Sequence, residues 1–122
     1  MTKMPDRLLL GTWKSDRRRT FRHWKSRPEV SAANHRKFRL LFGKLTIRWT
    51  PKYCYTDFDG DRSRGRYEVV ATDFDSIVVR VDAPSWMGEG ETMLYHIHFE
   101  DDYYWMALTS GFVEWFRRVP SR

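Results

Sequence analysis

From Lys44 to the C-terminus, apolar and polar residues alternate with period two, and this pattern most restricts the possible fold. In the first such segment, Leu45, Ile47 and Trp49 alternate with polar residues. The pattern predicts seven short β-strands, at residues 45–50, 53–56, 66–72, 77–81, 91–100, 103–109 and 112–119. Tight turns join most of them, and a polar loop at 57–65 separates the second from the third. Each strand is therefore expected to pair with its sequence neighbours.

An eighth strand is predicted near the N-terminus, in the apolar stretch from Leu8 to Asp16, where Trp13 supplies a large core side chain. An open sheet of eight short strands leaves two unpaired edges, and pairing the first strand with the last removes them. The predicted fold is therefore mainly β, an eight-stranded antiparallel up-and-down barrel. Residues 1–122 are expected to form one domain.

Between the first two strands the sequence predicts two helices, Asp16 to Lys25 with Ser15 as N-cap, and Ser31 to Phe42. From Lys14 to Arg48 there are 12 Lys or Arg residues against two acidic ones. The helices are expected to present a cationic cap formed by Arg17, Arg18, Arg19, Arg22, Arg36, Lys37 and Arg39. The cap is interpreted as a solvated face or as a surface for an anionic membrane. Nucleic acid is disfavoured, because rings that alternate inward leave no open groove for stacking bases.

Cys54 is the single cysteine, which excludes an internal disulfide and is typical of a reducing compartment. The sequence contains no apolar run long enough to span a bilayer as a helix. These features predict a cytoplasmic protein.

The pair Gly11-x-Trp13, the helices after it, the β-meander and a last strand ending Arg117-Arg118-Val119 resemble the calycin group. This group comprises the lipocalins, the intracellular fatty-acid-binding proteins and small bacterial lipocalin-like barrels. The resemblance implies that an Arg near the end of the last strand, Arg118 or else Arg117, packs on Trp13. It departs from the fatty-acid-binding branch on that strand, where Glu114 and Phe116 replace an Arg-x-Tyr pair that grips a carboxylate. A fatty acid is therefore not the expected ligand.

The predicted function is non-enzymatic binding of a small, largely apolar molecule inside the barrel. The residues expected to contact it are Tyr55, Tyr67, His96, His98, Trp105, Glu114 and Phe116. One alternative is an enzyme that uses the same pocket, with Glu114 as acid and base or the two histidines with a metal. The other is a module whose basic surface binds an anionic membrane or nucleic acid. Which face of strand 91–100 points inward stays open, and the more apolar set, Met93 to Phe99 in alternate positions, is favoured.

Two segments have the spacing of metal sites, but neither predicts one. His96-x-His98-x-Glu100 offers three ligands on one strand face without an identifiable partner ligand. The acidic segment from Asp57 to Glu68 has oxygen ligands at calcium-loop spacing, yet Arg62 stands where the loop needs Gly. No metal and no cofactor is expected.

Overall fold

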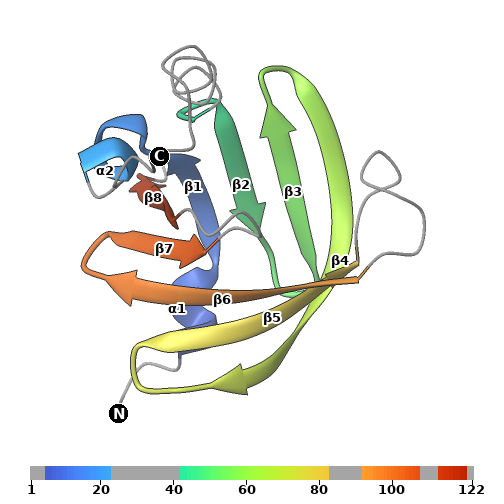
Figure 1. The fold of residues 1–122 in the computed structure, drawn as a ribbon. Coiled ribbons are helices and arrows are strands. Elements are labelled where there is room, and N and C mark those ends of the chain that lie inside the picture. The colour runs from blue at the N-terminus through green and yellow to red at the C-terminus, as the bar shows by residue number, and fades with distance from the viewer. Residues whose placement is uncertain (1–4, 23–41, 83–91, 108–112, 121–122) are drawn as a thin grey trace, which may run out of the picture.

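The computed structural model describes residues 5–22, 42–82, 92–107 and 113–120. These residues form a closed antiparallel barrel in which each strand pairs with its sequence neighbours and β1 pairs with β8 (Figure 1). The strands are β1 (Gly11–Ser15), β2 (Leu45–Trp49), β3 (Tyr53–Phe58), β4 (Asp61–Thr72), β5 (Ser76–Asp82), β6 (Thr92–Glu100), β7 (Tyr103–Ala107) and β8 (Val113–Val119). The predicted fold class is confirmed.

The described helices are short: α1 (Pro5–Leu9) precedes β1, and α2 (Arg17–Arg22) follows it. The prediction that the first strand begins near Leu8 is wrong, because α1 ends at Leu9 and β1 starts at Gly11. Leu9 is fully buried, so this apolar residue packs into the core from the end of a helix rather than from a strand. The predicted helix from Ser31 to Phe42 lies outside the described residues, apart from its last residue.

Asp16, rather than Ser15, caps α2. The Arg19 backbone N–H donates to Asp16 Oδ1 at 2.9 Å, which satisfies one of the free amides of the first turn. The Ser15 hydroxyl is turned inward and donates to Glu114 Oε2 at 2.7 Å. The prediction for this cap is thus one residue out of place.

The predicted loop from Asp57 to Gly65 is wrong, because the segment forms the paired ends of β3 and β4. The turn between them is Asp59-Gly60, and both residues have positive φ, 54° and 97°. Two such residues form the hairpin turn whose twist matches antiparallel strands, and Asp-Gly is a preferred pair there. The charged side chains of this hairpin therefore belong to a sheet.

The core is a cluster of rings and branched aliphatic side chains inside the barrel. Trp13 is 1% exposed, and Tyr104 and Phe116 are fully buried. The Tyr104 ring lies 4.6 Å from that of Trp13 and 4.9 Å from that of Phe116, measured between centroids. The prediction that Met93, Tyr95, Ile97 and Phe99 form the inward face of β6 is confirmed by the burial of Ile97 and by the packing of Tyr95 and Phe99 against the core.

The predicted contact between Trp13 and the last strand is confirmed for Arg118. Its guanidinium carbon lies 4.3 Å from the Trp13 ring centroid. The same guanidinium donates to the carbonyls of Leu8 and Leu10, at 2.6 and 3.1 Å, and so holds the end of α1 against the barrel. Glycine is favoured at position 11 because its φ is 123°, which L side chains rarely adopt, and a Cβ there would also lie 3.0 Å from Arg118 Nη1. Arg117 is exposed and points the other way.

Candidate functional site

The seven residues predicted to contact a ligand do not form one site. Tyr67, Glu114 and Phe116 face the barrel interior, as their registers with inward-facing residues show. The prediction that Tyr55 and Trp105 line the interior is wrong, because both lie on the outer face. His96 and His98 also lie there, as expected when the apolar face of β6 points inward. The inward neighbours of these four residues are Cys54, Ile97, Tyr104 and Met106, which are buried.

His96, His98 and Trp105 instead form a ladder of rings across β6 and β7. The two imidazoles are 4.0 Å apart, and His98 stacks on Trp105 at 3.9 Å with an interplanar angle of 9°. Burial and the neighbouring His96 lower the pKa of His98. His96 Nε2 and Ser76 Oγ are hydrogen-bonded at 2.9 Å. No group of three His, Cys, Asp or Glu side chains suited to a metal occurs in the part of the chain that the structure describes.

Inside the barrel, Glu114 is a buried carboxyl group with 6% of its surface exposed. Burial raises its pKa to about 7, and the hydrogen bond from Ser15 acts in the opposite direction. The Ser15 hydroxyl also accepts the Gly43 backbone N–H at 3.0 Å. Ser15 therefore links the buried Glu114 carboxyl to the backbone at Gly43, just before β2.

The predicted cationic cap is only partly a free surface. The Arg19 guanidinium lies 4.0 Å from the Tyr103 ring centroid and 4.5 Å from that of Trp115, so it packs against the barrel wall. Arg17 Nε donates to the Phe42 carbonyl at 2.8 Å. Arg18 and Arg22 are exposed. The other three members of the predicted cap, Arg36, Lys37 and Arg39, lie outside the described residues.

A concentration of cations that the sequence did not reveal lies on the outer face of β8, β1, β2, β3 and the first half of β4. We call it the cationic face, and it consists of Lys14, Arg48, Arg62, Arg64, Arg66 and Arg117. Asp57 lies among them and forms an ion pair with Arg62 Nε at 3.4 Å, and Arg66 borders a second hollow with Glu68 and Asp82. The hairpin tip adds Asp59, which pairs with Lys44 at 3.7 Å. Positive charge thus dominates this face.

The register places five of the six cations in two rows that cross the strands, and Arg66 lies opposite Tyr53, outside these rows. In one row Arg117, Lys14, Thr46, Asp57 and Arg62 are successive neighbours from β8 to β4. In the other row Thr12, Arg48, Tyr55 and Arg64 succeed one another from β1 to β4. Directly opposed residues in a sheet lie about 4.5–5.5 Å apart, so each row is continuous.

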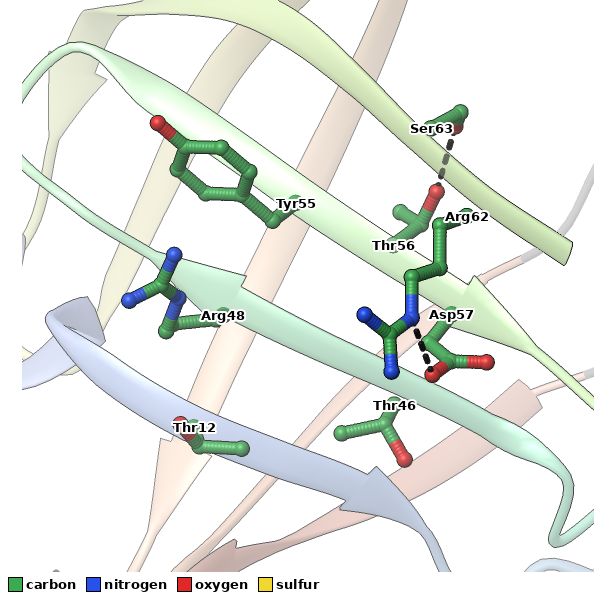
Figure 2. A pocket seen from close by; sticks show the side chains of 8 residues that line it. All are labelled: Thr12, Thr46, Arg48, Tyr55, Thr56, Asp57, Arg62 and Ser63. Carbon is green, nitrogen blue, oxygen red and sulfur yellow. Dashed lines mark hydrogen bonds and ion pairs between the residues drawn. The ribbon is translucent and has the colours of Figure 1, made fainter. Parts of the chain in front are cut away.

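A shallow hollow of about 310 Å³ opens between the two rows (Figure 2). Its lining includes the guanidinium groups of Arg48 and Arg62, the Tyr55 ring and the hydroxyls of Thr12 and Thr46. The Asp57 carboxylate, which pairs with Arg62, also lines the hollow. Arg48 and the hydroxyl groups therefore supply the hydrogen-bond donors that anionic oxygens require. The sequence signal that could have found it is the run Arg62-x-Arg64-x-Arg66, which places three cations on one face of a strand.

No described helix is both long and apolar enough to cross a bilayer. A cytoplasmic location stays a prediction. Comparison of the chain with family models, curated proteins and solved structures finds no match. The resemblance to the calycin group therefore stays a prediction.

Proposed function

We propose that this protein binds a polyanion on the cationic face. The observation that carries the proposal is the gathering of six cations on one outer face, from strands at both ends of the chain, where Asp57 is paired with Arg62. The strands of a closed barrel hold these side chains at fixed spacings. Binding therefore carries little entropic cost for ordering the backbone. A cationic face of this kind also attracts an anionic partner from a distance at low salt.

The first prediction is that Arg48→Glu/Arg64→Glu weakens binding to inorganic polyphosphate about 30-fold at low salt, because two contacts of about 1 kcal/mol each are lost. Isothermal titration at two salt concentrations measures it. The matched control is Arg18→Glu/Arg22→Glu, which makes the same change in net charge on exposed residues of α2. Equal losses in the two variants would show that net charge, rather than this face, determines binding.

A second variant of the same face should bind more tightly. Asp57→Asn removes the carboxylate and releases Arg62 from its ion pair. We expect about fivefold higher affinity for polyphosphate, with Asp73→Asn in the exposed turn before β5 as the control. A loss of affinity in Asp57→Asn would argue that the Asp57–Arg62 pair is needed to shape the hollow.

As a second candidate function, we propose that the barrel interior binds a small ligand. Of the predicted contact residues, Tyr67, Glu114 and Phe116 face inward and would contact it. It is favoured by the buried Glu114 carboxyl, whose raised pKa suits a neutral hydrogen-bonding ligand. A neutral naphthylamine dye is expected to bind at pH 6 more tightly than its sulfonated analogue, because burial in the barrel interior disfavours the charged sulfonate. Fluorescence titration tests this, and preference for the sulfonated dye would overturn it.

A further inference from the structure

The cationic face carries two tyrosine rings in addition to its charges. Tyr53 and Tyr55 project from the outer face of β3, are half-buried, and have ring centroids 6.3 Å apart. Rings that point into the barrel, as the sequence predicts, could not stack on bases. In the structure the two tyrosine side chains lie on the same face as Arg48, Arg64 and Arg66.

Each ring has a guanidinium beside it. The Arg48 guanidinium carbon lies 4.5 Å from the Tyr55 centroid, and that of Arg64 lies 5.0 Å from the Tyr53 centroid. Figure 2 shows Arg48 and Tyr55 projecting from neighbouring strands on the side of the hollow. Alternating rings and guanidinium groups offer flat surfaces on which a base can stack, and the guanidinium also carries the charge that a phosphate needs.

We propose that the polyanion is a single-stranded nucleic acid whose bases stack on Tyr53 and Tyr55, an inference that rests on the proposed function. The rows from β4 to β8 cross four strand intervals of about 4.8 Å, roughly 19 Å in all, which is long enough for several nucleotides. The hollow of about 310 Å³ is at the small end of ligand sites and suits one nucleotide. Arg48 and Arg62 then bind phosphates on either side of it.

A duplex fits these features less well, because its bases are stacked on one another and cannot reach a tyrosine ring. An anionic membrane also fits less well. The outward residues between the cations are Thr12, Thr46, Tyr53 and Tyr55, which carry hydroxyls. The strongly exposed apolar side chains, Phe74 and Leu94, lie instead on the β4–β5 turn and on β6. Binding to lipid requires buried apolar area as well as charge.

The test measures fluorescence anisotropy of a labelled 12-nucleotide single strand, with inorganic polyphosphate titrated in parallel. Tyr53→Leu/Tyr55→Leu is expected to weaken binding of the single strand by about 5- to 100-fold for each ring removed. Affinity for polyphosphate should change by less than about twofold, because the cations remain. Tyr55→Phe keeps the ring and is expected to bind the single strand as the unaltered protein does. Phe74→Leu, an exposed ring lost outside the face, is the matched control.

The outcomes separate this inference from the proposed function. Polyphosphate binding that depends on Arg48 and Arg64, together with a single strand that is insensitive to the tyrosines, would overturn the inference and leave the proposed function standing. The same holds if a duplex of equal length or phosphatidylserine vesicles bind more tightly than the single strand. Absence of binding to both polyphosphate and the single strand would overturn both.

Discussion

Trp13→Ala is expected to lower the free energy of unfolding by about 3 to 5 kcal/mol, the usual cost of truncating a large buried aromatic side chain. Trp13 is 1% exposed, and its ring contacts Tyr104 and Phe99. Its indole N–H donates to the Leu9 carbonyl at 2.8 Å, so the substitution also removes this hydrogen bond at the end of α1. Urea unfolding followed by circular dichroism measures the effect.

The matched control for this substitution is Trp105→Ala, on the half-buried outer face of β7. It should cost clearly less, because water already reaches part of that ring. In a double-mutant cycle, Trp13 and Arg118 should show a coupling of about 0.5–2 kcal/mol from the cation over the ring. If Trp13→Ala lowers the free energy of unfolding by less than about 1 kcal/mol, the contacts of Trp13 do not hold β1 against β8.

The barrel could be predicted from the sequence because its strands are short and alternate, and because closure is the simplest way to remove two sheet edges. The start of β1 could not. Leu8, Leu9 and Leu10 form an apolar run that is too short to distinguish a buried strand from the end of a helix. Pro5 was the available signal, since proline is favoured at the first position of a helix.

The orientation of side chains was predicted correctly where the two faces of a strand differ strongly. On β6, Ile97 and its alternate neighbours are clearly more apolar than His96 and His98. On β3 the buried position belongs to Cys54, and the larger Tyr55 lies outside. A shift of one residue moves every side chain to the other face, so a choice based on ring size fails on such a strand. Trp105 was misplaced for the same reason, because its face follows from pairing with His98.

Only the β4 part of the cationic face could be predicted from the local sequence, through the run Arg62-x-Arg64-x-Arg66. Its members run from Lys14 to Arg117 and come together only when β1 pairs with β8 and β3 pairs with β4. The charge count along the chain instead predicts a cationic surface on the helical segment after β1. There, Arg19 packs on Tyr103 and Trp115, so part of that charge is used to attach α2 to the barrel.

The stability of the protein should fall as the pH rises between about 4.5 and 7, because of Glu114. Burial raises the pKa of this carboxyl to about 7 in the folded protein, above its ordinary value of 4.5. The folded state therefore holds the proton more tightly than the unfolded chain. Its contribution to stability is fully present below pH 4.5 and is lost as the pH rises through about 7. A shift of this size corresponds to about 3 kcal/mol at most, since each pH unit is worth about 1.4 kcal/mol.

Glu114→Gln isolates this contribution from the other groups that titrate in the same range, including His98. The amide stays uncharged at every pH and can still accept the hydrogen bond from Ser15. We expect the variant to lose most of the decline in unfolding free energy between pH 5 and pH 8, and to be the more stable protein at pH 8. Urea unfolding of both proteins at pH 5, 6, 7 and 8 provides the comparison. Parallel curves for the two proteins would mean that Glu114 is ionised in the folded state at neutral pH, with water or a rearranged chain around its carboxylate.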